Sequence, residues 1–117
     1  MNTNINDYIV KTTQNEWQPL IEKGIHYEGI FVQSLKFDPE KNRSTNILLK
    51  FEPGASYPYH NHPAGEELFI LEGEAFIAGA HLEKGDFLYT PPGFKHSVKS
   101  ENGCIIYFMI PEEVEIL

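Results

Sequence analysis

Three histidines and a glutamate between residues 60 and 96 have the residue types and spacing of a metal site. His60 and His62 are separated by one residue, and side chains two apart on an extended segment point the same way. Pro63 favours an extended His62, because a residue before proline avoids the helical region. Glu66 can add a carboxylate after a short loop, and His96 can add an imidazole from a distant strand. Imidazole and carboxylate suit a divalent first-row metal (Fe, Mn, Zn, Ni, Co or Cu), so one such ion is predicted.

Glu66 and Glu67 compete for the carboxylate position. Adjacent residues on a strand point to opposite faces, so only one of them can bind the metal. Gly65 permits the sharp turn that returns Glu66 to the face of the histidines. Glu67 and Tyr59 remain candidates for a catalytic acid or base, although nothing in the sequence singles out either.

Composition excludes several classes of protein. The chain has 117 residues, enough for one domain, and 9 basic against 17 acidic residues give a net charge of −8. Binding to nucleic acid needs clustered lysines and arginines, so we expect no nucleic-acid partner. The longest apolar run, 104–111, is too short to cross a bilayer, and residues 1–7 do not resemble a signal peptide. The single cysteine, Cys104, is predicted to be a buried free thiol, and we expect a cytoplasmic protein.

Short β-prone runs separated by turn residues predict an all-β sandwich or barrel. The Asn102-Gly103 pair favours a tight hairpin, because both residues tolerate positive φ. The predicted strands cover 17–20, 29–37, 45–52, 68–72, 75–80, 86–89, 96–99 and 104–110.

Two segments, 67–71 and 104–110, lack the alternating polar residues that would form a solvent-facing side of the strand. A strand with one solvated face should alternate, so both segments are expected to be covered on both sides. A partner subunit in a homodimer is favoured over cover by a second sheet and the N-terminal segment. Residues 1–15 are predicted to be a tail or an arm, and residues 16–117 a single domain.

The two histidine segments resemble both sequence motifs of the cupin superfamily, whose members are also called RmlC-like. The first motif, G(X)5HXH(X)3–4E(X)6G, is matched at every position from Gly54 to Gly73. The second, G(X)5PXG(X)2H(X)3N, is matched from Gly85 to His96, with Ser100 in place of the final Asn. Short phrases such as His60-Asn-His-Pro-Ala-Gly-Glu-Glu-Leu are most similar to the ChrR-like cupins, a group that includes anti-sigma factor domains and acetylacetone-cleaving dioxygenases.

This resemblance implies a double-stranded β-helix, or jelly-roll barrel, of two antiparallel sheets with the metal near one mouth. It implies that His60, His62, Glu66 and His96 are the ligands. Among the aromatic residues near the motifs, Tyr59, Phe94 and Tyr107 are the predicted liners of a substrate pocket. Few positive charges lie nearby, so a small neutral or enolisable substrate is favoured over a polyanion.

Three functions are compatible with these residues. The first is a mononuclear iron dioxygenase acting on a small organic molecule, such as a diketone or a hydroxylated aromatic. The second is a non-catalytic, metal-dependent ligand-binding or sensor module, related to the cupin domains of anti-sigma factors. The third, a cupin without bound metal, is the least favoured because all four ligand positions are present.

Overall fold

The computed structural model describes all 117 residues, and every strand pairing in it is antiparallel. A short 3-10 helix, η1 (Ile5–Tyr8), precedes the strands. The strands are β1 (Gln18–Glu22), β2 (Ile25–Asp38), β3 (Arg43–Phe51), β4 (Ser56–Asn61), β5 (Glu66–Ile77), β6 (Ala80–Glu83), β7 (Phe87–Thr90), β8 (Lys95–Lys99), β9 (Cys104–Met109) and β10 (Glu115–Ile116). No helix is long and apolar enough to cross a membrane.

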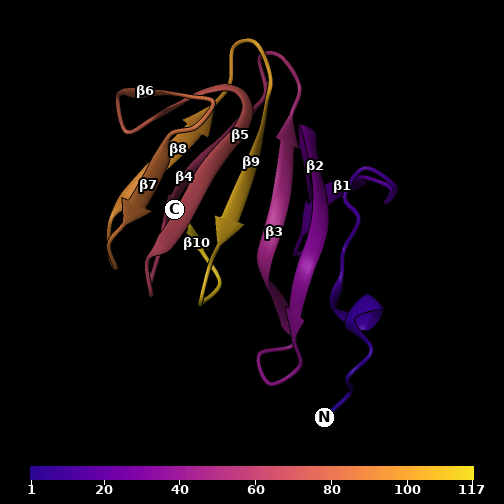
Figure 1. Ribbon diagram of the computed structural model, residues 1–117. Coiled ribbons are helices and arrows are strands. Elements are labelled where there is room, and N and C mark those ends of the chain that lie inside the picture. Colours follow the sequence, from indigo (N-terminus) through magenta and orange to yellow (C-terminus); the bar gives the residue numbers. More distant parts are fainter.

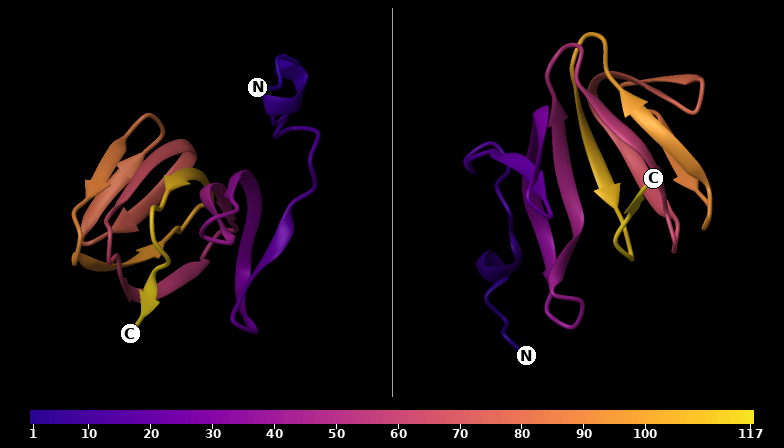
Figure 2. Two further views of the ribbon diagram at one scale, coloured as in Figure 1. Left: turned by 90° about the horizontal axis from the view of Figure 1, so that it is seen from below. Right: turned by 180° about the vertical axis from the view of Figure 1, so that it is seen from behind.

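The strands form two layers that share β5. One layer runs β1-β2-β3-β9-β5-β7, and the other runs β10-β4-β8-β5-β6. Figure 1 shows the curled sheet, and the end-on view in Figure 2 shows its strands around a common interior. The predicted all-β jelly-roll architecture is therefore confirmed.

The core follows the period-2 alternation of the strands. In β9 the burial alternates without interruption, with Ile106 and Phe108 facing inward and Ile105 and Tyr107 half-exposed on the outer face. β9 packs against fully buried partners, among them Leu68, Ile70 and Ile30. The segment 104–110 is thus apolar on both faces, as its sequence indicates, but within one chain only the inner face is fully covered.

The break predicted near Gly73 is wrong, because β5 continues through it from Glu66 to Ile77. Gly73 has φ +74°, and a Cβ there would lie 2.1 Å from the carbonyl oxygen of Gly103. The pairing register with β9 also shifts between Ile70 and Glu72. The glycine lets one strand bend from the first layer into the second, so a residue typical of turns here marks a bend within a strand.

The predicted hairpin at Asn102-Gly103 is also wrong. β8 pairs with β4 and β5, whereas β9 pairs with β3 and β5, so the chain crosses between layers here. Glu74 holds this crossing, because its Oε1 accepts hydrogen bonds from the backbone N–H groups of Glu101 and Asn102 at 3.2 Å each. Ser100, at the position of the motif Asn, donates to the Glu74 carbonyl at 2.7 Å.

Three strands were not predicted as such: β4, β6 and β10. β4 contains Pro58 and few aliphatic residues, and β10 has only two residues, so neither has a strong strand pattern. The N-terminal segment lies to one side of the two layers (Figure 2). It is tied to β2 by a hydrogen bond of 2.9 Å from Gln33 Nε2 to the Thr12 carbonyl. Cys104 is free and buried, as predicted, and burial raises the pKa of its thiol to about 11.

Substituting Gly73 by alanine tests the bend in β5. Gly73→Ala introduces both the left-handed strain and a clash with backbone, and we expect it to lower the free energy of unfolding by about 2–4 kcal/mol. Gly79→Ala is the matched control, because Gly79 has φ +80° but open space at its Cβ; it should cost about 1–2 kcal/mol. Urea unfolding followed by circular dichroism measures both, and equal losses would contradict the proposed close approach.

Candidate metal centre

A β-bulge in β4 places two functional side chains on the same face. Tyr57 pairs with Val98, and His60 pairs with His96. The two β4 residues are therefore three positions apart, whereas their β8 partners are two positions apart. In a regular strand, residues three apart point to opposite faces. The extra residue at the bulge turns both Tyr57 and His60 inward, where each is buried.

Three imidazole rings converge inside the domain. The ring centroids of His60, His62 and His96 lie 4.4–5.0 Å apart. One ligand nitrogen from each ring lies within 4.8 Å of the others, and all three residues are buried. These rings come from the end of β4, the residue after it, and β8. The arrangement could hold one metal ion, since it offers three nitrogen ligands around one point.

Backbone carbonyls fix the orientation of two of these rings. The Nδ1 of His60 lies 2.6 Å from the Pro58 carbonyl, and the Nδ1 of His62 lies 2.8 Å from the Phe94 carbonyl. A carbonyl only accepts, so each Nδ1 carries the proton and donates it. Each Nε2 is then the nitrogen available for a metal, and ligating histidines in metalloproteins are oriented by this kind of hydrogen bond.

Glu66 completes the cluster. One carboxylate oxygen lies 3.2 Å from His62 Nε2, and the other lies 3.7 Å from His96 Nε2. Three buried atoms here have no hydrogen-bond partner: His62 Nε2, Glu66 Oε1 and His96 Nδ1. Buried polar atoms are normally paired, so the unpaired His62 Nε2 and Glu66 Oε1, which lie next to His96 Nε2 and to each other's residues, fit a divalent cation.

Burial and mutual repulsion keep two of the histidines neutral. Burial lowers the pKa of His60 to about 4, with a further contribution from His62. Burial, followed by His62 and His60, lowers the pKa of His96 to about 3. Burial also opposes protonation of His62, but the Glu66 carboxylate, 3.2 Å from its Nε2, outweighs burial and raises the pKa of His62 above its ordinary value. His62 therefore keeps its proton at pH values at which His60 and His96 are already neutral.

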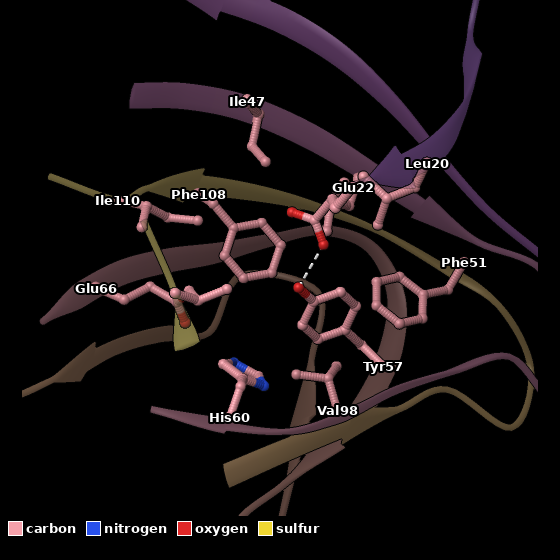
Figure 3. A pocket seen from close by; sticks show the side chains of 12 residues that line it. Leu20, Glu22, Ile47, Phe51, Tyr57, His60, Glu66, Val98, Phe108 and Ile110 are labelled. Atoms are coloured by element: carbon pink, nitrogen blue, oxygen red, sulfur yellow. Dashed lines mark hydrogen bonds between the residues drawn. The ribbon is translucent and has the colours of Figure 1, made fainter. Parts of the chain in front are cut away.

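An apolar cavity of about 40 Å³ reaches the cluster at His60 and Glu66 (Figure 3). Nine of its twelve lining residues are hydrophobic, and they come from both layers of the fold. The other polar contributor is Glu22, whose carboxylate accepts a hydrogen bond of 2.5 Å from the Tyr57 hydroxyl. A small molecule in this cavity would contact the metal ligands on one side and mainly carbon atoms elsewhere.

The structure places the other sequence-predicted site residues around this centre rather than in the cavity. Tyr59 is 53% exposed. Tyr107 lies on the outer face of β9, where its hydroxyl accepts a hydrogen bond from Asn46. Phe94 lines a second cavity of about 130 Å³, which His96 also lines. Glu67 pairs with Met109 and Tyr89 on the outer face of β5, opposite to the inward-facing Glu66.

Tyr57 and Glu22 were not among the predicted site residues. Tyr57 lies three residues before His60, and only the bulge brings it to the same face. Glu22 ends β1, which is far from both motifs in the sequence. Burial, reinforced by the Glu22 hydrogen bond and charge, raises the pKa of Tyr57, so its hydroxyl remains a donor at neutral pH.

The all-β fold with this internal histidine cluster defines a cupin. The family model of the ChrR cupin-like domain matches residues 6–112, and the chain belongs to that family. The expected superfamily and the subfamily resemblance are both confirmed.

Two curated relatives match part of the chain. Dimethylsulfoniopropionate lyase DddQ from Ruegeria pomeroyi is 42% identical over 52 residues, which are 40% of this chain and 26% of that protein. DNA damage-repair/toleration protein DRT102 from Arabidopsis thaliana is 33% identical over 61 residues, which are 47% of this chain and 20% of that protein. The matched segments thus span about a quarter of the first relative and a fifth of the second.

A solved acetylacetone dioxygenase from Acinetobacter johnsonii resembles the whole domain. The two structures give a TM-score of 0.80 at 18% sequence identity, covering 93% of this chain and 76% of that one. At this identity the likeness shows the shared fold.

Proton release on metal binding tests the charge state of the cluster. At about pH 5.5, His60 and His96 are neutral while His62 is protonated, so binding of Zn²⁺ should release about one proton. Three histidines of ordinary pKa would release nearly three. Calorimetry in buffers of different ionisation enthalpy measures how many protons are released per zinc ion bound. A value near three would contradict the assigned protonation states.

Proposed function

We propose that the chain is a metal-dependent cupin in which His60, His62, His96 and Glu66 hold one divalent first-row metal ion. The observation that supports this most strongly is the convergence of three buried imidazoles whose orientation leaves ligand nitrogens facing one point. The unpaired buried atoms His62 Nε2 and Glu66 Oε1 support the same conclusion. The cavity that ends on His60 and Glu66 gives a small molecule access to that point.

We further propose that the protein is a dioxygenase acting on a small organic molecule, either a diketone or a hydroxylated aromatic. The fold shared with an acetylacetone dioxygenase supports this class, as does the predominantly apolar cavity. A first-row metal bound here would act as a Lewis acid toward an enolisable or phenolic oxygen and, if it is iron, would supply electrons to dioxygen.

The residues of the chain contribute orientation and exclusion of water. The carbonyls of Pro58 and Phe94 hold the rings of His60 and His62 in one tautomer. Apolar side chains such as Phe108 and Val98 line the approach and keep it dry, which strengthens polar interactions inside. Glu66 offsets part of a cation's charge, so the charge of the centre matches an anionic enolate or phenolate.

Removing one imidazole tests the metal centre and the activity together. His60→Ala should abolish stoichiometric iron binding and oxygen uptake with a panel of diketones and dihydroxyphenyl compounds, after anaerobic reconstitution. Glu66→Gln should weaken metal binding by about 10–100-fold. His81→Ala is the control, because His81 is exposed and stacks on Phe76 away from the centre; it should behave as wild type.

The same experiment separates the two functional classes. Tight metal binding without oxygen uptake across the panel would favour the alternative, a non-catalytic ligand-binding or sensor module. Full metal binding and turnover in His60→Ala would contradict the proposed centre.

We also propose a homodimer formed through the outer face of β3, β9, β5 and β7. A cross-strand row on that face is apolar and runs from Leu48, which is already buried, through Tyr107 and Phe69 to the exposed Phe87. A two-fold axis near the row would bury it against its own copy. Residues 1–15, with the exposed Ile9 and Val10, are proposed to be an arm that docks on the neighbouring subunit.

A charge on that row tests the dimer. Phe87 is 58% exposed, so Phe87→Glu should leave the monomer folded but shift the dimer toward monomer by at least tenfold in dissociation constant. Phe37→Glu is the control, because Phe37 is 55% exposed but lies on β2 outside the row. Sedimentation equilibrium measures both variants, and an unchanged dimer in Phe87→Glu would contradict this interface.

A further inference from the structure

The cavity above the metal centre has a second polar end. Glu22 enters it from β1, whereas His60 enters from β4 in the other layer (Figure 3). Between them lie carbon-rich walls that include Phe108 and Phe51. A carboxylate is the least common type of group in an apolar cavity, because burial disfavours its charge. Glu22 is half-buried and also lines the outer groove, so its carboxylate lies at the mouth of the cavity, where an incoming ligand would meet it.

The Glu22 carboxylate is only half satisfied by the protein. Its Oε1 accepts the hydroxyl hydrogen of Tyr57 at 2.5 Å, and no hydrogen bond from the chain reaches Oε2. No basic side chain pairs with it either, because the adjacent Lys23 turns outward to Glu113 at 3.4 Å. One carboxylate oxygen is therefore free to accept a hydrogen bond from a bound molecule.

Tyr57 presents a second hydrogen-bond acceptor beside Glu22. Its hydroxyl hydrogen is committed to Glu22, so the phenol oxygen can only accept from a ligand. The pair also lies where the cavity meets the surface, because Glu22, Tyr57 and Val114 line both the cavity and an outer groove of about 260 Å³. A ligand whose far end reaches the inner side of this mouth meets two acceptors, Glu22 and Tyr57, whereas the donors Lys23 and Tyr27 line only the outer groove.

We propose that Glu22 and Tyr57 form a specificity-determining subsite that selects a small, largely apolar ligand with a hydrogen-bond donor, a hydroxyl or an amine, at the end remote from the metal. The proposal rests on the proposed metal centre, which binds the other end of the ligand. It favours the hydroxylated aromatics over simple diketones, because acetylacetone has no donor to offer once its oxygens face the metal. A second anionic group on the ligand is repelled by the Glu22 charge.

Paired probes that differ in one hydroxyl test this subsite. Zinc-loaded protein, which is redox-inert, is titrated calorimetrically with 4-methylcatechol and with 4-(hydroxymethyl)catechol. A hydrogen bond to a charged acceptor should make wild-type protein bind the alcohol about tenfold more tightly than the methyl compound. Glu22→Gln should abolish this preference and Tyr57→Phe should reduce it, both measured as the ratio of the two affinities, so that a general loss of binding, which affects both probes alike, leaves the ratio unchanged.

Glu113→Gln is the matched control, because it makes the same change in a carboxylate of the outer groove that does not line the cavity. It should retain the wild-type preference. A purely structural role of Glu22 would lower the affinity for both catechols equally and leave their ratio unchanged, which would overturn the proposal. Equal binding of the two probes by wild-type protein, or binding of neither, would also overturn it. Zinc binding, measured in a separate titration of each metal-free protein, decides the metal centre independently.

Discussion

The burial of unpaired nitrogen and oxygen atoms around one point is the constraint on which the site depends. A buried polar atom without a partner costs about 1–3 kcal/mol, so the unpaired His62 Nε2 and Glu66 Oε1 make the metal-free site unfavourable. A cation coordinated by those atoms converts that cost into favourable interactions. The His62–Glu66 contact at 3.2 Å is a partial substitute, because it lets one proton occupy the position that a metal would take.

The backbone makes this arrangement possible through two local irregularities. The bulge in β4 turns Tyr57 and His60 to one face, and the carbonyl of the bulged Pro58 then orients His60. The bend at Gly73 carries β5 from one layer to the other, so that the sheet curls around the site. A regular flat sheet would leave the imidazoles on opposite faces or exposed, and the cluster could not form.

Much of this could be predicted from the sequence, because the decisive information is local. The spacing of His60 and His62, the loop to Glu66 and the second segment ending in His96 predict four side chains that lie close together, and the structure brings them together. The apolar alternation and frequent turn residues predict the all-β class. The Asn-Gly pair did not predict its local structure, because its neighbours β8 and β9 belong to different layers, which turn propensity alone does not reveal.

The cavity wall could not be predicted for a related reason. Glu22 reaches the site from β1 through long-range pairing, and Tyr57 through a bulge that shifts the face of every residue before it. Tyr59 and Tyr107 lie nearest the motifs in sequence or on the strands, yet the pleat turns them away from the cavity. Side-chain direction in such a strand depends on register, and a shift of one residue reverses it.

X-ray absorption spectroscopy at the metal edge tests the central claim most directly, because it counts the ligands of a bound ion. For the zinc-loaded protein, the account predicts three imidazoles at about 2.0–2.1 Å with at least one additional oxygen ligand. The multiple-scattering features should fall from three imidazoles to two in His96→Ala. A spectrum dominated by water oxygens, or one that His96→Ala leaves unchanged, would contradict a centre built from these residues.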